Sequence, residues 1–398
     1  MRIIFVFYEL KLWSGVRGVA RLGLFRAIRE NDLTNEGEFF DEFGLRFSRA
    51  ALTKSGLEGE TRPLSQRIPL ARHFSDVVLS PNRRGGYLIK GDSIVVPQSL
   101  DPAVPRLFFP GTRVGGVLGQ KAEKVLVKKT DLLAIKYGVF CGSLAPYNWY
   151  HWTIDYLAAV WRIRNLPREF DNFPLIVPEF DLGRSSFLEA LEKVLGPRKI
   201  EWVNPEGHYR VSSLVRVSGL TTPAPRSLQE PTGGRVWFDC DGIREFRKHQ
   251  LESFGVDDGE IIATRRLFLV REGGSRDYNE HEIWAIAKRF GFVRVSLEGL
   301  TLGTSMQLFR SAELVVGPHG AGWADFIYCS RATRALIFSW KDQRGDNWYE
   351  NVAMISDGSL NFLLYDESRM VGKDPRNSQH YLSPKKFERE LERLAGAK

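Results

Sequence analysis

The sequence has few cysteines and no long hydrophobic run. Its three cysteines, Cys141, Cys240 and Cys329, lie far apart and form no CxxC pair. Neither a disulfide framework nor a structural zinc site is therefore expected, and a reducing compartment fits. The apolar opening over residues 1–8 is too short to span a bilayer and carries no cleavage-site pattern, so the sequence predicts neither an anchor nor a signal peptide. We expect a cytoplasmic protein.

The sequence also lacks internal repeats, low-complexity tracts and a GxGxxG motif after an early strand. The missing motif argues against a dinucleotide-dependent oxidoreductase. The net charge is +8 and the pI is near 9.3, so anionic partners are expected. The positive charge is scattered and forms no basic stripe interleaved with aromatics, which argues against a nucleic-acid-binding protein.

Residues Val16 to Glu30 alternate arginines with apolar side chains, a spacing that predicts an amphipathic basic helix. Such a helix could lie on the inner face of the cell membrane, where a lipid-linked substrate would be found. The interpretation that we favour is a helix packed on its own domain with solvated arginines. A peripheral membrane contact therefore stays an open alternative.

The length and the order of apolar runs predict a two-domain α/β protein. At 398 residues, with 43% hydrophobic and 26% charged residues, the chain can form two globular cores. Strand and helix patterns alternate in both halves, most regularly between residues 266 and 365, and residues 218–234 are rich in proline and glycine. We expect domains at 1–220 and 236–378, with a final helix within 379–398 crossing back to the first domain.

The most informative stretch is a strand that runs into three closely spaced glycines. Glu313 to Val316 predict a buried parallel strand, and Gly317 to Gly322 predict a tight turn into a helix. Such a turn presents backbone N–H groups and a positive helix end to an anion, with diphosphates favoured. Small residues in such a turn can also be needed only for close packing of the helix on the strand. The turn alone therefore does not decide between anion binding and packing.

Polar residues follow the preceding predicted strand at the same edge of the sheet. Arg271 and Arg276 come after its end, and Asn279 and Glu280 begin the next helix. Because the carboxyl ends of parallel strands face one crevice, two arginines and the glycine turn should meet there.

In the first half, a helix is predicted from about Asn148. Its spacing places His151 and Asp155 one turn apart, with Asn148 and Trp152 on adjoining parts of the same face. A carboxylate beside an imidazole can orient it and raise its basicity, as in a general base. The alternative is structural: Asn148 as a helix cap, Trp152 as a core aromatic, and the His–Asp pair as a local hydrogen bond.

The sequence Asp239-Cys240-Asp241 matches the Asp-x-Asp pattern that holds a divalent metal in many sugar-nucleotide enzymes. Carboxylates at a helix start are also common caps, and these lie beside the predicted linker. We therefore expect capping here and no metal site.

Taken together, four motifs resemble glycosyltransferase family 61 over roughly residues 130–365. They are the Val316–Gly322 loop, Arg271 with Arg276–Glu280, the Asn148–Asp155 helix, and Asn347-Trp348. The resemblance implies an inverting glycosyltransferase of the GT-B type, with two Rossmann-like domains facing a cleft. It also implies a nucleotide-sugar donor, such as a UDP-sugar, without an obligatory metal, and a role in bacterial capsule, exopolysaccharide or lipopolysaccharide assembly. The sequence departs from the family pattern at Trp323-Ala324-Asp325, where a leucine, a small polar residue and asparagine are more usual.

With this chemistry, the candidate residues receive roles. His151, oriented by Asp155, is the expected base toward an acceptor hydroxyl, and Asp155 itself is the alternative base. The supporting residues on the acceptor side are Asn148, Trp152 and Trp348. The expected donor and diphosphate contacts come from Arg271, Arg276, Asn279, Glu280, Pro318, His319, Gly320, Ala321 and Gly322. The expected partners are a nucleotide sugar and a glycan or lipid-linked saccharide, and the alternative is a catalytically silent protein that binds nucleotide sugars or polysaccharide.

Overall fold

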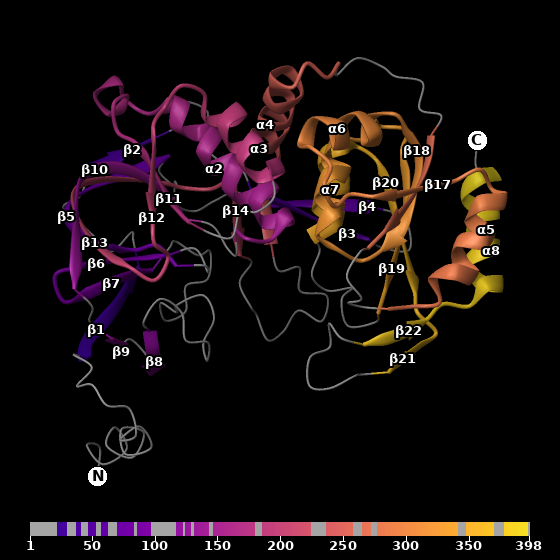
Figure 1. The fold of residues 1–398 in the computed structure, drawn as a ribbon, viewed down its shortest axis with the longest axis horizontal. Coiled ribbons are helices and arrows are strands. Elements are labelled where there is room, and N and C mark those ends of the chain that lie inside the picture. Colours follow the sequence, from indigo (N-terminus) through magenta and orange to yellow (C-terminus); the bar gives the residue numbers. More distant parts are fainter. Residues whose placement is uncertain are drawn as a thin grey trace, which may run out of the picture.

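The computed structural model describes most of the chain, with gaps. The described residues are 22–29, 37–40, 47–52, 57–62, 70–82, 86–96, 117–121, 124–128, 131–142, 146–179, 185–223, 236–257, 265–271, 277–340, 348–369 and 378–396. They form a mixed α/β structure in which most strands and helices of the N-terminal half lie at left in Figure 1 and those of the C-terminal half at right.

The C-terminal half is built on a parallel five-stranded sheet. Its strands follow the order β17-β16-β18-β19-β20, and all four pairings are parallel. The regular alternation predicted between residues 266 and 365 is thus confirmed. The elements are β16 (Arg265–Val270), α5 (Glu280–Arg289), β17 (Val293–Ser296), α6 (Leu302–Arg310), β18 (Ala312–Pro318), the 3-10 helix η5 (Ala321–Tyr328), β19 (Arg334–Ser339), α7 (Trp348–Ser356) and β20 (Ser359–Leu364).

Helices cover both faces of this sheet because neighbouring residues of each buried strand point to opposite sides. Phe268 and Val316 belong to a core shared with α5 and with α8 (Pro384–Gly396). Leu267 and Val315 face the other way, into a core shared with α6, η5, α7 and the helices of the N-terminal half. The sheet is therefore the middle layer of three.

The order of these strands creates a switch point. From β16 the chain moves first to β17 on one side, then returns to β18 on the other side and continues outward. The helical connections consequently leave β16 and β18 in opposite directions, which opens a crevice beyond their carboxyl ends. Arg271 directly follows β16, and His319 and Gly320 directly follow β18.

The N-terminal half contains a second parallel unit within a larger sheet. β10 (Leu132–Cys141), β11 (Leu175–Pro178), β12 (Ile200–Val203) and β13 (His208–Val217) lie in the order β12-β11-β10-β13 and are mutually parallel. Here the chain reverses direction at β10, so a second switch point lies between β10 and β13. The helices α2 (Leu157–Arg162) and α3 (Ser185–Leu195) pack on one face of this unit.

Mostly antiparallel strands extend this sheet beyond β13. β5 (Ala71–Ser80) pairs antiparallel with β13, and β1 (Leu22–Arg29) pairs parallel with β7 (Ser93–Val96). The other strands are β2 (Gly37–Phe39), β6 (Tyr87–Lys90), β8 (Val117–Lys121) and β9 (Lys124–Lys128).

The helix expected over Val16–Glu30 is wrong for its described part. Leu22–Arg29 forms β1, paired with β7 and β9, and the rest of that range lies outside the described residues. Leu24 and Arg26 are exposed while Ala27 is buried, which is the period of a strand. Pairing with two neighbouring strands has overridden the helical spacing.

A small sheet combines strands from both sides of the expected domain boundary. β14 (Thr221–Pro223) and β15 (Val236–Asp239) pair with each other, and β15 pairs with β3 (Phe47–Leu52), which forms a hairpin with β4 (Leu57–Arg62). This indigo hairpin lies beside α7 of the C-terminal half (Figure 1). The division at 1–220 and 236–378 stays a prediction, and the structure shows that the two halves share a sheet and a core.

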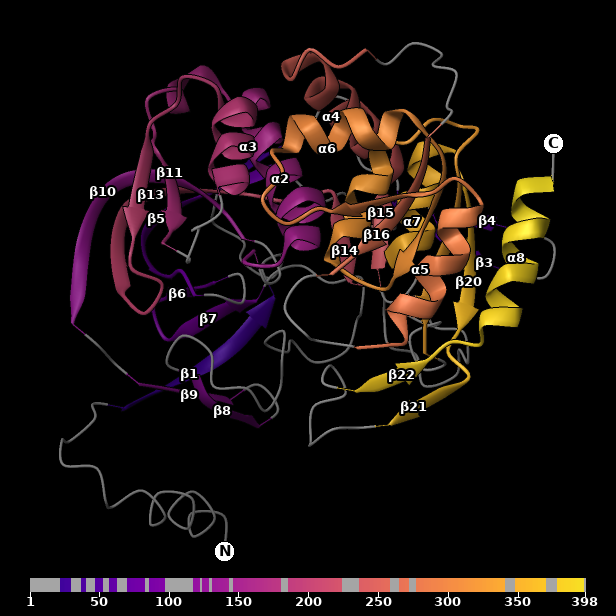
Figure 2. The same ribbon diagram turned by 45° about the vertical axis from the view of Figure 1, so that its right-hand side comes forward.

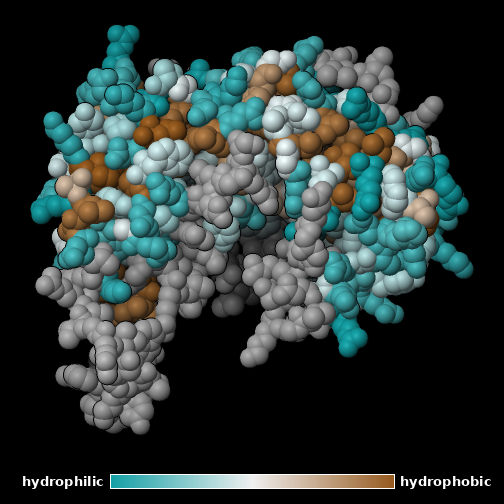
Figure 3. Space-filling view, in the orientation of Figure 1, coloured by the Kyte–Doolittle hydropathy of each residue, from teal (hydrophilic) through white to brown (hydrophobic). Residues whose placement is uncertain are grey.

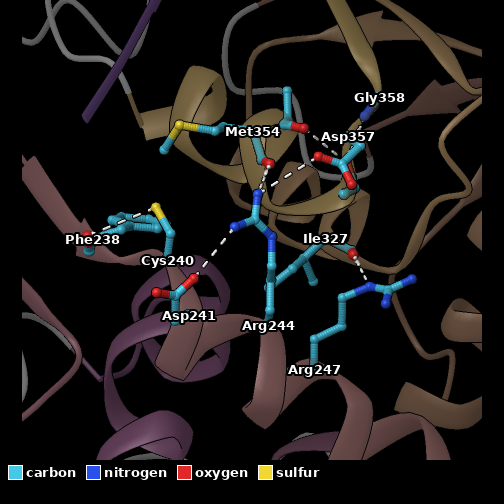
Figure 4. A network of polar contacts seen from close by, with 11 residues as sticks. Phe238, Cys240, Asp241, Arg244, Arg247, Ile327, Met354, Asp357 and Gly358 are labelled. Carbon is cyan, nitrogen blue, oxygen red and sulfur yellow. Dashed lines mark hydrogen bonds and ion pairs between the residues drawn. The ribbon is translucent and has the colours of Figure 1, made fainter. Parts of the chain in front are cut away.

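The helix α4 (Cys240–Ser253) contacts the carboxyl-terminal ends of η5 and α7. Asp239 caps its start by accepting from the N–H of Gly242 at 3.2 Å. Arg247 donates to the carbonyl of Ile327 at 2.7 Å and Arg244 to that of Met354 at 3.0 Å, near the carboxyl ends of η5 and α7 (Figure 4). Cationic side chains at these ends satisfy carbonyls left without helical partners.

The final helix does not cross back to the first domain, contrary to expectation. Phe387 and Leu391 of α8 are buried in the core on the outer face of the C-terminal sheet, and Arg289 of α5 pairs with Glu388 at 2.7 Å. Figure 2 shows α8 beside α5, on the side away from the N-terminal half. The hairpin of β21 (Glu367–Arg369) and β22 (Gln379–Tyr381) precedes it. The apolar side of α8 packs on the outer face of the C-terminal sheet, next to α5.

The surface around α5 and α8, at right in Figure 3, is mostly hydrophilic, as expected for the solvated sides of outer helices. Among the helices that the structure describes, none is long and apolar enough to cross a membrane.

Candidate active site

The helix after β10 contains a π-helical segment. After a helical start at Trp149 and Tyr150, residues His151–Tyr156 form a π-helix (η2), and the N–H of Leu157 donates to the carbonyl of Trp152, five residues back. Short π segments interrupt α-helices frequently at functional sites. Both residues of the expected His–Asp pair lie in it.

His151 and Asp155 are hydrogen-bonded, and a third residue completes the arrangement. His151 Nδ1 lies 2.7 Å from Asp155 Oδ2, and Thr221 Oγ1 donates to Asp155 Oδ1 at 2.7 Å. An ionised carboxylate can only accept, so this contact favours the tautomer of the neutral imidazole with its proton on Nδ1 and its lone pair on Nε2. Among the described residues Nε2 has no hydrogen-bond partner, and the His151 side chain is 16% exposed.

Thr221 follows the loop that leaves the carboxyl end of β13, which with β10 forms the switch point of the N-terminal half. The buried Arg162 donates from Nη1 to the carbonyl of Ser218 at 2.6 Å, within that loop. Arg162 thus holds the loop that leads to Thr221, and Thr221 fixes the orientation of the Asp155 carboxylate. The carboxylate in turn fixes the orientation of the His151 imidazole.

The other switch point brings Arg271 to the glycine turn. Arg271 Nη1 donates to the carbonyl of His319 at 3.0 Å, and a Cβ on Gly320 would lie 3.2 Å from the same nitrogen. A Cβ on Gly317 would lie 2.8 Å from Leu269 Cβ, so glycine here allows β18 to approach β16 closely. The expected meeting of Arg271 with the turn is confirmed, while Arg276 lies outside the described residues.

The start of α7 brings the two switch points together. The ring of Trp348 lies 5.0 Å from that of His151, and the ring of Tyr349 lies 4.8 Å from that of His319. Tyr349 also donates to the carbonyl of Gly320 at 2.9 Å. His151 and His319 therefore flank the same two aromatic residues.

Tyr150 and Trp340 extend this aromatic group. Tyr150 donates to the carbonyl of Trp348 at 2.9 Å and its ring lies 6.0 Å from that of Tyr349. Trp340, directly after β19, lies 5.2 Å from His319, ring to ring. Neither residue was singled out by the sequence, where isolated aromatics look like core residues.

Several of the expected site residues have structural partners. The side-chain amide of Asn279 donates from Nδ2 to the carbonyl of Leu382 at 3.0 Å and accepts at Oδ1 from the N–H of Leu382 at 2.9 Å. Glu280 is hydrogen-bonded to Arg294. Asn148 accepts from the N–H of Tyr150 at 3.0 Å, the capping role given above as its alternative. Trp152 is fully buried and stacks on a neighbouring tyrosine, so it is a core residue. Their proposed contacts with substrate stay predictions.

A buried carboxyl group, Asp325, adds a contact that the sequence indicated only as a departure from the family pattern. It lies in η5, is 1% exposed, and accepts from Trp149 Nε1 at 2.8 Å and from Ser305 Oγ at 2.5 Å. Burial raises the pKa of Asp325 to about 6, and the hydrogen bonds from Ser305 and Trp149 oppose that rise.

The raised pKa predicts how stability changes with pH. The unfolded chain releases this proton near the ordinary pKa of 3.8 and the folded chain near 6, so folding stability falls as pH rises between these values. About two pH units at roughly 1.4 kcal/mol each give a loss of about 3 kcal/mol. Urea unfolding of the wild type and of Asp325→Asn at pH 4.5 and 7.5 measures about 2 kcal/mol of this loss, because the unfolded chain has already released most of the proton at pH 4.5. The variant should lack this loss, and an equal pH dependence in both proteins would contradict the assignment.

The described residues contain no group of three or more His, Cys, Asp or Glu side chains placed to hold a metal ion. Asp239 serves as the helix cap described above, and Asp241 lies 3.7 Å from Arg244. The capping expected for the Asp-x-Asp sequence is confirmed for Asp239.

Comparisons with known proteins agree with the motifs over part of the chain. The family model Glycosyltransferase 61 matches residues 149–336, from the first residue of the helix that contains His151 to the middle of β19. No curated protein matches the chain. The solved structure of the dodecameric iron-containing heptosyltransferase TibC in complex with ADP-D-β-D-heptose is 12% identical, over 77% of this chain and 78% of that one, with a TM-score of 0.22. A likeness at this TM-score supports no inference about fold or donor. Residues 149–336, which contain both switch-point histidines, are a glycosyltransferase 61 domain.

Proposed function

We propose that the protein is an inverting glycosyltransferase that transfers a sugar from a nucleoside-diphosphate donor to a hydroxyl of a glycan or lipid-linked acceptor. The observation that carries the proposal is the pair of ring contacts at the start of α7. His151, whose Nε2 has no hydrogen-bond partner among the described residues, contacts Trp348, and the turn at His319 and Gly320, which Arg271 contacts, adjoins Tyr349. The two histidines thus meet at the start of α7, although they follow strands of different sheets.

The donor would bind at the switch point between β16 and β18. Its diphosphate would contact Arg271 and the backbone around Gly320, Ala321 and Gly322, where η5 begins. The first N–H groups of a helix have no helical acceptor and carry partial positive charge. As the glycosidic bond breaks, negative charge grows on the diphosphate, and these groups stabilise it. We propose that they do so without an obligatory metal, with His319 and Pro318 completing the turn.

The acceptor would approach from the opposite side of the sugar. Inversion requires one in-line displacement, in which the acceptor hydroxyl loses its proton as the diphosphate leaves. His151 Nε2 takes this proton, and Asp155 stabilises the imidazolium through Nδ1. The two parallel units would face each other as in a GT-B enzyme, with the donor on the C-terminal one.

The biological setting we propose is bacterial surface polysaccharide assembly, on the family resemblance of the motifs. A UDP-sugar is the first donor to try. Thermal unfolding with UDP, GDP, CMP and their sugars identifies the nucleotide, since a ligand at a hundred times its Kd adds about 2.7 kcal/mol of stability. Release of free nucleoside diphosphate, in the presence and absence of EDTA, then tests transfer and its metal independence. Nucleotide binding without release of nucleoside diphosphate, whichever acceptor is added, would favour the catalytically silent binding protein instead.

Thr221→Val should weaken turnover modestly. The substitution keeps the shape of the side chain and removes one of the two hydrogen bonds described for the Asp155 carboxylate, so that His151 alone of these two partners still holds it. A net hydrogen bond contributes about 1 kcal/mol, which corresponds to roughly fivefold in kcat. Steady-state kinetics with saturating donor measures it. A kcat equal to that of the wild type would mean that Thr221 does not hold Asp155 during the reaction.

A further inference from the structure

Asp325 joins elements that carry the two sides of the proposed site. Trp149, which donates to Oδ1, stands two residues before His151. Asp325 itself stands in η5, the helix that begins next to Gly320, and Ser305, which donates to Oδ2, belongs to α6. The carboxyl group therefore connects the start of the π-helical segment with the segment that follows the glycine turn.

We propose that Asp325 is a positioning residue for sugar transfer, acting through Trp149 to set where His151 stands relative to the His319–Gly320 turn. The inference rests on the function proposed above. Asp325 touches neither histidine in the contacts described; it acts through the indole it holds, which also packs against Phe187 at 5.0 Å, ring to ring.

The chemistry of the contact supports a role beyond packing. Tryptophan Nε1 is a donor only, so it needs an acceptor at this place, and a carboxylate or an amide oxygen can provide one. A fully buried carboxyl group lowers stability at neutral pH, which an apolar core residue would not do. The titratable side chains that interact with it, Tyr328 and Cys329, have pKa values raised by burial and stay neutral there. The destabilising charge in this core is thus that of Asp325, at a contact between the N-terminal and C-terminal halves.

A set of four variants tests the proposal by donor and acceptor kinetics. Asp325→Ala and Trp149→Phe should each lower kcat about 10- to 100-fold, because misplacing a catalytic group by about 1 Å costs that much. The KM for the donor should change little, since the donor contacts are intact. Asp325→Asn keeps an acceptor oxygen for Trp149 and should restore most of the turnover. In the Asp325→Ala, Trp149→Phe double variant the loss should equal that of one single variant, because both remove the same contact.

The matched control is Tyr328→Phe. It removes another buried hydrogen bond from the same helix, the 2.8 Å bond to Gln250, which does not reach the N-terminal half. It should lower thermal stability while kcat stays near that of the wild type. Trp149→Phe retains the ring contact with Phe187, so it remains informative if Asp325→Ala does not fold.

Two failures can be told apart. A wild-type protein that binds nucleotides but never releases nucleoside diphosphate would overturn the proposed function, and this inference with it. An active wild type whose Trp149→Phe variant keeps full kcat, or whose two single losses multiply in the double variant, would overturn the role of Asp325 alone.

Discussion

His151→Ala is expected to remove sugar transfer while nucleotide binding remains. The substitution deletes the imidazole whose Nδ1 is held by Asp155 at 2.7 Å and whose Nε2 has no partner in the part of the chain that the structure describes. Loss of a general base lowers rates by about a hundredfold to ten-thousandfold. The reduction should lie in kcat, because His151 belongs to the side of the site away from the diphosphate contacts. Single-turnover kinetics with a saturating donor, beside nucleotide-induced thermal stabilisation, measures both quantities.

Two further variants make this result specific. His281→Ala removes an exposed histidine from α5, on the outer layer of the C-terminal half, and should leave kcat unchanged. Asp155→Asn should reduce kcat less than His151→Ala if the aspartate only orients the imidazole. Should His151→Ala retain full turnover while Asp155→Asn loses it, the carboxylate would be the base.

Arg271→Ala should produce the second large effect, this time on the donor side. The guanidinium lies over the carbonyl of His319 and next to Gly320, at the carboxyl ends of the two strands that form the switch point. Removing one preorganised donor from developing negative charge costs on the order of 10²- to 10³-fold. The loss should appear in kcat/KM for the nucleotide sugar and in weaker stabilisation by the free nucleoside diphosphate.

Charge and geometry can be separated at this position. Arg271→Lys keeps the charge but loses the planar fork, so it should recover part of the lost rate. Arg289→Ala removes another exposed arginine of the same half, one that pairs with Glu388, and serves as the control. An Arg271→Ala protein with unchanged donor kinetics would place the diphosphate elsewhere.

The sequence was most informative where contacts are local. In the C-terminal half a single helix joins each strand to the next one along the chain, so periodicity and turn residues predicted the alternation and placed Arg271 beside the glycine turn. The spacing of His151 and Asp155 similarly predicted a contact within one helical turn, although the π-helical form of that segment was not expected.

Contacts between distant segments were not predictable from local patterns. Thr221 bonds Asp155 across 66 residues, and it lies within residues 218–234, which resembled a linker because they are rich in proline and glycine. Leu22–Arg29 became a strand because two other strands pair with it. The apolar stripe of α8 did not say which sheet face it would cover. In each case the deciding partner lies far along the chain.

The shared small sheet has a consequence for how much of the chain makes one working unit. β15 pairs with β3 (residues 47–52), and the hairpin of β3 and β4 contacts α7. The helix α7 contains Trp348 and Tyr349. A fragment limited to residues 149–336 would omit the hairpin, half of β19 and both aromatic residues between the histidines. The smallest piece able to assemble the site thus reaches well beyond the family-matched segment in both directions, and variation near residue 50 can alter chemistry three hundred residues later.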